Sequence, residues 1–278
     1  MCLGALSHCY PRQNIPHNVD MKAPMTIKQY VSQMRKIPGG RFTMGRTYSI
    51  KDNNGIFKDE VPAHPVDISP FRMGATPLTV GMWREYLRAN SSLSMPEPPE
   101  WGWIDSHPMV NVSWNDIMGP DGKGGYATWA SRVAGVRLSL PTEAQREYVA
   151  KGGKDSKFPW GNEYDDSKVW SSVKKIRSGT AAVDRLNNVF VNKFGVSDVC
   201  GNVLEWCLDG YQPYVKSFDR LGYVSVLRDP VGAGYDKCFR GGSWDLYYPD
   251  YFRCANRDWY FPVGWNYFIG FRLSAGPK

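Results

Sequence analysis

The sequence predicts a single α+β domain in which short helices and short strands alternate with much irregular structure. Glycine (28) and proline (20) together exceed a sixth of the 278 residues, and both interrupt regular elements. Hydrophobic residues at 42% and charged residues at 22% are typical of a globular chain that is long enough to bury its own core. No second composition regime and no internal repeat interrupts the chain, so we expect one domain.

The first 26 residues read as an N-terminal extension, and the domain is expected over residues 27–278. Pro11, Pro16 and Pro24 lie in the extension without any periodic apolar pattern. The turn-rich pattern of the domain begins near Ile37, where Phe42–Gly45 is expected to form a short strand closed by glycine.

Helices are predicted where a capping residue precedes an apolar face. Thr79 can cap a helix whose apolar residues share one face, namely Val80, Trp83 and Leu87. Ser113 can cap another helix beginning at Trp114, and a glycine-rich loop over residues 119–125 separates it from a helix over 126–133.

A further helix is expected over Glu143–Ala150. Thr142 and Gln145 form a capping box at its start, and Gly152 and Gly153 stop it. Glu143 and Glu147 lie one turn apart, which solvated helix faces produce routinely, so they give no signal of paired catalytic acids. Beyond this helix no further long helix is expected.

The placement of charge argues against nucleic-acid binding. The formal net charge is +7, but residues 1–60 hold nine Lys and Arg against four Asp and Glu. A base-stacking surface combines aromatic residues with a cationic groove, whereas the aromatic-rich segment 244–271 has two arginines against three aspartates. No apolar run approaches the roughly 18 residues of a membrane span.

The cysteines and the N-terminus leave two questions open. The six cysteines form no CxxC and the four histidines are scattered, so a zinc site is not expected; disulfides are not excluded. The start lacks the basic and apolar regions of a secretory signal. If a leader has been removed, Cys2 could carry the lipid anchor of a bacterial lipoprotein; an ordinary frayed terminus is the alternative.

Common enzyme motifs, such as GxSxG, the Walker loop and HExxH, are absent from the sequence. The stretch from Phe194 to Trp206 places Asp198, Asn202 and Glu205 around Gly201. A carboxylate beside a tight glycine turn can supply oxygen ligands to calcium. The alternative is a buried hydrogen-bonded turn that fixes the core.

Eight stretches resemble, in order, the formylglycine-generating-enzyme (sulfatase-modifying factor) family, which has a variant of the C-type lectin fold. They cover roughly residues 37–273 and are Ile37–Gly45, Pro108–Trp114, Arg137–Gln145, Phe158–Gly161, Gly201–Trp206, Arg240–Trp244, Arg253–Arg257 and Gly270–Arg272. The resemblance implies a C-type lectin fold of the formylglycine-generating-enzyme type.

The same resemblance bears on activity and metals. The family's catalysts use two copper-binding cysteines just after the Gly-Gly-Ser-aromatic motif, and here Leu246 and Tyr251 stand at or beside those positions. Neither can ligate copper or act as a thiolate, so we expect no oxidase activity and no required cofactor. Family members also bind calcium near the Gly-Asn motif. The matching residues are Asp198 with the backbone of Val199, Gly201 and Val203.

The C-terminal tail, residues 244–271, has an unusual composition. It contains 12 aromatic residues in 28, where the chain's 14% predicts about four. Trp244, Phe252, Phe268 and Phe271 lie in or beside the motifs and are expected in the core.

The tail also contains no Lys, Glu, Gln or Met. Asn codons mutated only at adenines never yield these four residue types, nor Trp.

This tail resembles the variable proteins of diversity-generating retroelements, in which an error-prone reverse transcriptase rewrites adenine-derived positions. The resemblance implies a non-catalytic, receptor-like protein that binds a variable protein or other surface ligand, and it places the protein at the cell surface. The tryptophans Trp244, Trp259 and Trp265 should then be scaffold. The expected ligand-binding residues are Asp245, Leu246, Tyr247, Tyr248, Asp250, Asn256, Asp258, Tyr260, Phe261, Val263 and Asn266.

Two alternatives remain at this stage. One is an enzyme of the formylglycine-generating superfamily with altered chemistry. The other is a lectin-like adhesion module that is not diversified. The composition of the tail favours a displayed binding surface over both, because Tyr, Asp and Asn between fixed motifs resemble the composition of an antibody paratope.

Overall fold

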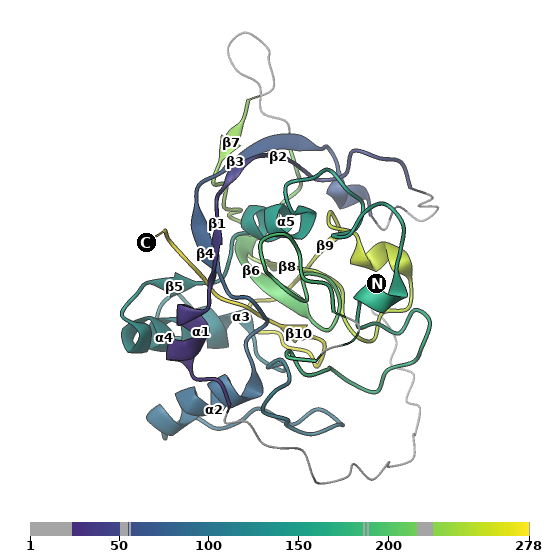
Figure 1. Ribbon diagram of the computed structural model, residues 1–278. Helices are drawn as coiled ribbons and strands as arrows, with labels where there is room; N and C mark the ends of the chain where they lie inside the picture. Colours follow the sequence, from purple (N-terminus) through teal and green to yellow (C-terminus); the bar gives the residue numbers. More distant parts are fainter. Residues whose placement is uncertain are drawn as a thin grey trace.

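The computed structural model describes residues 24–50, 55, 57–185, 187, 189–215 and 225–277. Within these residues the chain forms short helices and three small sheets joined by long irregular segments (Figure 1). The α+β class expected from the sequence is confirmed, with short helices, short strands and much irregular structure.

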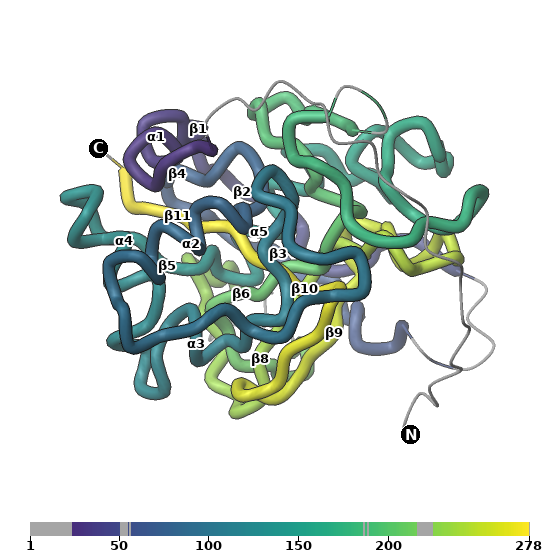
Figure 2. Tube along the Cα trace, turned by 90° about the horizontal axis from the view of Figure 1, so that it is seen from below, coloured from purple at the N-terminus to yellow at the C-terminus, as the bar shows by residue number. Residues whose placement is uncertain are grey.

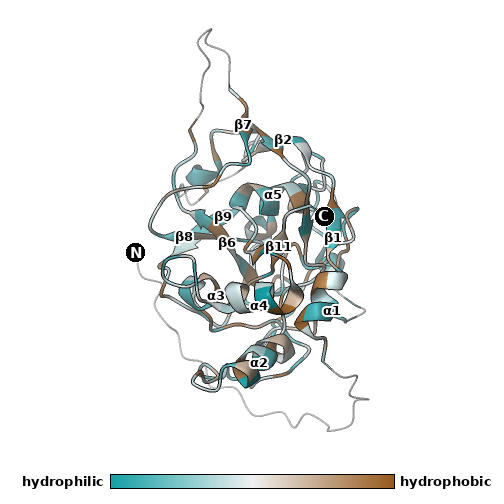
Figure 3. Cartoon of the chain, turned by 90° about the vertical axis from the view of Figure 1, so that its left-hand side faces the viewer, coloured by the Kyte–Doolittle hydropathy of each residue, from teal (hydrophilic) through white to brown (hydrophobic). Residues whose placement is uncertain are grey.

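One sheet joins the two ends of the domain. Its order is β1-β4-β11-β5, and its strands are Arg35–Ile37, Phe71–Met73, Ser274–Ala275 and Leu138–Ser139 respectively. All three pairings are antiparallel. The helices α1 (Ile27–Ser32), α2 (Val80–Ala89) and α4 (Tyr126–Ala134) gather at this end of the molecule (Figures 1 and 3).

The second sheet carries the tail. Its order is β10-β6-β8-β9, with strands Ile269–Gly270, Leu204–Gly210, Lys237–Arg240 and Arg257–Tyr260. Strand β10 runs parallel to β6, whereas β8 pairs antiparallel with both β6 and β9. The tail therefore supplies both outer strands of this sheet, and β9 lies beside β8 in Figure 2.

The third sheet has the order β2-β3-β7, with strands Gly40–Met44, His64–Ile68 and Leu227–Arg228. Helix α5 (Glu143–Lys151) contacts β2 and β3 of this sheet and β6 and β8 of the second (Figure 1). It thus lies between two sheets, which explains why nearly all its residues are buried. The remaining helical segments are α3 (Trp114–Met118) and the 3-10 turns η1 (Lys58–Glu60), η2 (Asp166–Lys168) and η3 (Pro249–Phe252).

Aromatic side chains fill much of the core. In the largest cluster the rings of Trp83 and Tyr126 stack at 5.1 Å between centroids, and Phe271 meets both edge-on. Phe252 lies in a smaller cluster with Phe158. Phe252 and Phe271 of the tail are 0% exposed, as expected for core residues, and each fully buried aromatic ring contributes roughly 2–3 kcal/mol through the hydrophobic effect.

The expected helix starts are confirmed. Thr79, Ser113 and Thr142 each accept a hydrogen bond from the backbone N–H three residues later, and the last two close full capping boxes. Helix α3 ends at Met118 and α4 begins at Tyr126, so residues 119–125 form the expected loop. The expected strand near Phe42 is β2.

Helix α1 was not expected from the sequence. Thr26 and Gln29 form its capping box, a signal that the nearby prolines obscured. The proposed domain boundary coincides with its first residue, Ile27, while Cys2 and the rest of residues 1–23 lie outside the described part of the chain. Among the described residues, no helix has both the length and the apolar character needed to cross a bilayer.

Candidate ligand-binding surface

The exposed large hydrophobic side chains of the described chain gather in the tail. Eight of fifteen lie between residues 247 and 267, and seven of these are aromatic. They are Tyr247, Tyr248, Trp259, Tyr260, Phe261, Val263, Trp265 and Tyr267. A patch of this kind on a globular protein marks an interaction site, because exposed aromatic rings otherwise favour burial.

Local structure explains which tail residues face solvent. Strand β9 is an edge strand that starts at the buried Arg257 and continues through the exposed Asp258, Trp259 and Tyr260. Tyr247 and Tyr248 precede η3, and their rings contact each other at 4.6 Å between centroids. The irregular chain between β9 and β10 exposes Phe261, Val263, Trp265 and Tyr267.

Buried arginines anchor the tail between its exposed segments. Arg253 and Arg257 within the tail, and Arg272 directly after it, are each at most 4% exposed. Their carboxylate partners are Glu60 of η1 at 2.5 Å, Glu143 of α5 at 2.7 Å and Glu205 of β6 at 2.6 Å. All three partners lie outside the tail. The tail's course is therefore fixed by side chains that no ligand can reach.

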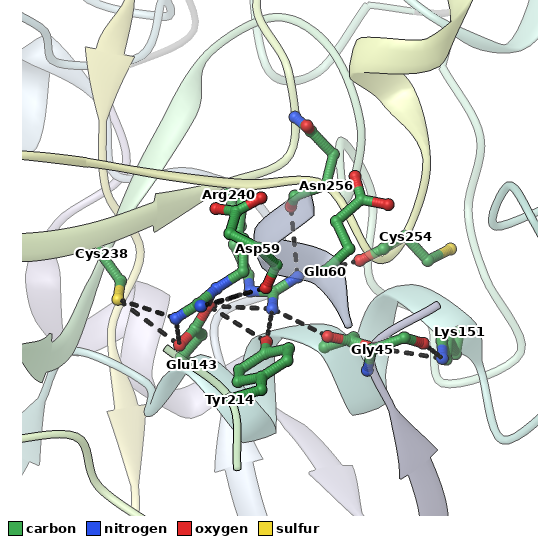
Figure 4. A network of polar contacts seen from close by, with 12 residues as sticks. Gly45, Asp59, Glu60, Glu143, Lys151, Tyr214, Cys238, Arg240, Cys254 and Asn256 are labelled. Atoms are coloured by element: carbon green, nitrogen blue, oxygen red, sulfur yellow. Dashed lines mark hydrogen bonds and ion pairs between the residues drawn. The ribbon is translucent and has the colours of Figure 1, made fainter. Parts of the chain in front are cut away.

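Glu143 is the centre of a buried polar network (Figure 4). Its carboxylate accepts from Arg240 Nε at 2.9 Å and from Arg257 Nε at 2.7 Å, and Tyr214 also contacts Arg240. Burial alone would raise the pKa of Glu143, but the two guanidinium groups outweigh it and lower the pKa to about 2. The carboxylate is thus held ionised in the core.

This network corrects the expectation that Glu143 and Glu147 form a solvated helix face. They are 4% and 0% exposed, and Glu147 pairs with Lys151 at 3.0 Å and Arg240 at 2.8 Å. Because α5 lies between two sheets, both sides of the helix are covered. The only sequence signal was the number of arginines in the motifs, which need acidic partners if buried.

The structure divides the eleven expected binding residues into three groups. Six are exposed: Tyr247, Tyr248, Asp258, Tyr260, Phe261 and Val263. Four are half-buried: Asp245, Leu246, Asp250 and Asn266. Of these, Leu246 packs against the Phe158 cluster, and Asp250 forms ion pairs with Lys157 and Arg253.

Asn256 is the exception, because the structure buries it. It is 5% exposed and its side-chain amide donates to the carbonyl of Tyr251 at 3.0 Å. Its carbonyl accepts from Arg240 at 3.2 Å. The expectation that it contacts a ligand was therefore wrong; it stabilises the chain between η3 and β9.

The tail tryptophans and Phe268 are not fully buried. Trp259 and Trp265, which are expected to be fixed scaffold positions, are 39% and 52% exposed and so lie at the surface. Trp244 and Phe268 are half-buried, not core, although Phe268 packs against the largest cluster. Edge strands and irregular loops bury only part of a large ring, a detail that the motif positions did not reveal.

Trp244 belongs to a group of three rings that also contains Trp101 and Tyr267, which we call the three-ring cluster. The ring centroids lie 5.2 Å apart for Trp101–Trp244, 6.3 Å for Trp101–Tyr267 and 5.9 Å for Trp244–Tyr267. Partial burial raises the pKa of Tyr267, and the nearby carboxylates of Asp245 and Glu100 add to this effect. Sequence reasoning missed this cluster because Trp101 is distant in sequence from Trp244 and Tyr267, and no local pattern links them.

The turn around Gly201 does not fit the expected calcium ion. Both carboxylate oxygens of Asp198 accept from the guanidinium of Arg185, at 2.5 and 2.8 Å. The Val199 carbonyl accepts from Arg146, and that of Gly201 accepts from the N–H of Val203. A calcium ion would have to displace these donors. No group of three or more acidic, His or Cys side chains suited to a metal occurs among the described residues.

The turn is instead a buried hydrogen-bonded structure, the alternative considered above. Asn202 is 0% exposed; its side chain accepts from the N–H of Ala181 and donates to the carbonyl of that residue. Glu205 pairs with both Arg146 at 3.0 Å and Arg272 at 2.6 Å. This turn therefore connects the second sheet to the tail.

All four cysteines that the structure describes are free thiols in the core. They are Cys200, Cys207, Cys238 and Cys254, each at most 4% exposed. Burial raises the pKa of Cys200 to about 12 and raises those of the other three thiols too. Such thiols are poor nucleophiles and poor metal ligands.

Comparison with known proteins agrees with this arrangement. The family model of the sulfatase-modifying factor enzyme 1-like domain matches residues 21–275. The chain belongs to this family. Curated proteins similar to this chain include the formylglycine-generating enzyme of Thermomonospora curvata, which is 27% identical over 93% of this chain and 98% of its own. They also include the inactive C-alpha-formylglycine-generating enzyme 2 of Mus musculus, which is 28% identical over 65% of this chain and 70% of its own.

A solved structure supports the fold. Treponema denticola variable protein 1 superposes with a TM-score of 0.68, covers 88% of this chain and 95% of its own, and is 22% identical. The chain therefore has the C-type lectin fold of the formylglycine-generating-enzyme type, as the motifs predicted.

Proposed function

We propose that this chain is a non-catalytic, receptor-like protein that binds protein or other surface ligands through its tail. The tail is proposed to have been diversified by a retroelement. The observation that carries the proposal is the exposure of seven aromatic rings within residues 247–267, since such rings supply large contact areas at low conformational cost.

The anchoring of the tail supports diversification. Arg253, Arg257 and Arg272 hold the chain through buried ion pairs, while six of the expected binding residues are exposed. Substitutions at exposed positions away from such networks usually change stability by less than about 0.5 kcal/mol. A surface of this design tolerates many sequences on one backbone.

The residue types of the tail support the same proposal. Lys, Glu, Gln and Met are absent from residues 244–271, which is the pattern that adenine-directed mutagenesis of Asn codons leaves. The variable protein of Treponema denticola shares the fold. The test is to sequence the DNA flanking the gene: we expect a near-identical template repeat differing at adenines, beside a reverse-transcriptase gene. A complete locus without them contradicts diversification.

An enzyme with altered chemistry is the second candidate, because curated relatives are named as formylglycine-generating enzymes. Against it, the motifs place Leu246 and Tyr251 at or beside the positions of the family's copper-binding cysteines. The tail's one cysteine, Cys254, is buried and its pKa is raised. An assay for copper-dependent oxidation of a cysteine-containing peptide distinguishes the enzyme from the binding protein. We expect no turnover; turnover would establish the enzyme instead.

The proposed binding function needs no cofactor, and it places the protein at the cell surface, where a diversified receptor meets its partners. Cys2, which lies outside the described residues, is the proposed site of a lipid anchor. Mass spectrometry of the protein purified from its native membranes tests this: a diacylglycerol adduct on Cys2 is expected. An unmodified Cys2 would remove this anchor from the proposal.

A further inference from the structure

The three-ring cluster brings Trp101, from outside the tail, together with Trp244 and Tyr267, which lie near the two ends of the tail. The ring of Trp101 stands nearly perpendicular to those of Trp244 and Tyr267, with interplanar angles of 81° and 85°. On its other side Trp101 packs against Gly179, where an added Cβ would come within 2.6 Å of the ring. Tyr267 is 46% exposed, so the cluster is accessible from solvent.

Two carboxylates accompany the rings. Asp245 directly follows Trp244 in the chain and Glu100 directly precedes Trp101, and partial burial, with the negative charges of both, raises the pKa of Tyr267. One oxygen of Asp245 accepts from Ser243 Oγ at 2.5 Å. Within the described part of the chain, no ion pair involves either carboxylate. Nor does any described Lys or Arg lie over one of the three rings.

We propose that the three-ring cluster, with Asp245 and Glu100, binds a lysine or arginine side chain of the protein ligand. The inference rests on the proposed binding function and names the chemistry of its partner. Faces of Trp and Tyr attract cations through the ring quadrupole, and carboxylates form charge-assisted hydrogen bonds with ammonium and guanidinium groups. The arginines in and directly after the tail cannot fill the site, because Arg253, Arg257 and Arg272 are buried in other pairs.

The site combines fixed and variable parts. Trp101 lies outside the tail, and mutagenesis of Asn codons at adenines cannot create Trp244. Asp245 can arise in this way, and so can the neighbouring Tyr247 and Tyr248. We infer that the tryptophans give every version of the surface a constant preference for a cation, while the surrounding positions select the ligand that presents it.

The test uses small probes and the fluorescence of the full-length protein. We expect N-acetyl-arginine amide and N-acetyl-lysine amide to change tryptophan emission saturably at millimolar concentration. The neutral citrulline analogue should not bind. Choline carries the same charge without N–H donors, so it should bind more weakly than either amide.

Variants separate the cluster from the rest of the surface. Trp101→Ala and Asp245→Asn are each expected to weaken binding of the arginine probe about fivefold or more, as measured by isothermal titration calorimetry. Tyr235→Ala and Asp121→Asn, which alter an exposed ring and an exposed carboxylate outside the tail, should leave it unchanged. Circular dichroism melting confirms that each variant is folded.

Three results overturn the proposal: equal binding of the citrulline analogue, tighter binding of choline than of the amides, or full affinity in a folded Asp245→Asn variant. No binding of any probe by the wild type also overturns it. None of these results touches the retroelement test of the flanking DNA. The cation site and the diversified binding function can therefore fail separately.

Discussion

The carboxylate of Glu143 lies 2.7 Å from Nε of Arg257, and this contact joins the first turn of α5 to the first residue of β9. From Arg257 onward the strand exposes Asp258, Trp259 and Tyr260. The position of the exposed strand is therefore set by an ion pair from which solvent is excluded. A buried ion pair thus positions β9, and the exposed residues of this strand can change without altering that ion pair.

Glu143→Gln should destabilise the domain strongly. The substitution removes the negative charge that Arg240 and Arg257 share, and leaving buried charges without their partner costs about 3–5 kcal/mol. In a chain of this length we expect the melting temperature to fall by roughly 10 °C. Calorimetry checks this. Glu100→Gln, which alters an exposed carboxylate, is the control; a similar small effect in both variants would contradict the central role of Glu143.

Tyr248→Ala and Phe252→Ala form a matched pair four residues apart. Tyr248 is 58% exposed and Phe252 is 0% exposed. We expect Tyr248→Ala to change the free energy of unfolding by less than about 0.5 kcal/mol, and Phe252→Ala to lower it by about 3–5 kcal/mol. Urea denaturation measures both. A large loss for Tyr248→Ala would mean that this ring is part of the core and not a displayed residue; Tyr260→Ala repeats the test on β9.

How far the sequence predicts the structure depends on the range of the interactions involved. Capping at Thr79, Ser113 and Thr142 is local, so the helix starts could be read directly. The motifs predicted the fold because they contain the glycines of its turns and the buried residues of its core. Which tail side chains face solvent could be predicted only in part. Asn256 and Asp258 are both polar, yet Asn256 is buried and Asp258 is exposed, so residue type alone does not separate them.

The ion pairs could not be predicted because their members are remote in sequence. Glu60 and Arg253 are 193 residues apart, and Glu143 and Arg257 are 114 apart. Nothing in the local pattern says that a helix with five charged or polar residues will be enclosed on both sides. The same reason hid the three-ring cluster, where Trp101 reaches the tail from a distant loop.

The four described cysteines should resist alkylation in the folded protein. Each is at most 4% exposed, and burial raises the pKa of every one of these thiols, so little thiolate is available at pH 8. Iodoacetamide treatment followed by peptide mass spectrometry should find Cys200, Cys207, Cys238 and Cys254 unmodified without denaturant and modified in guanidinium. Fast labelling of Cys254 in the native protein would restore the enzyme hypothesis.

Calcium should not stabilise the protein. The two oxygens of Asp198 are held by Arg185 and the Val199 carbonyl by Arg146, so an ion gains no ready ligand at this turn. We expect the same melting temperature in millimolar calcium and in a chelator. The informative variant is Arg185→Ala, which removes the donors that hold the Asp198 carboxylate. Its melting temperature should be lower than that of the wild type. A calcium-dependent rise in the wild-type melting temperature would mean that the ion displaces Arg185.

The pH dependence of stability should reveal Asp209, a buried carboxyl on β6. It is 4% exposed, and its oxygens accept from the N–H of Glu143 at 2.7 Å and of Gly232 at 2.8 Å. Burial, with the negative charge of Glu143, raises its pKa from 3.8 to about 7. The folded state therefore holds this proton up to about pH 7, whereas the unfolded state releases it near pH 3.8.

Between these two values the folded state binds more protons, so the contribution of Asp209 to the free energy of unfolding falls as pH rises, by up to about 4 kcal/mol. Glu143 acts in the opposite direction: its pKa is lowered to about 2, and the stability it adds is lost as pH falls below about 4.5. Urea denaturation of wild type, Asp209→Asn and the exposed control Asp121→Asn between pH 4.5 and 8 separates the two effects. The stability difference between wild type and Asp209→Asn should shrink steadily up to pH 7 and then stay constant. A difference independent of pH would mean that Asp209 is ionised throughout, with its two backbone donors outweighing burial.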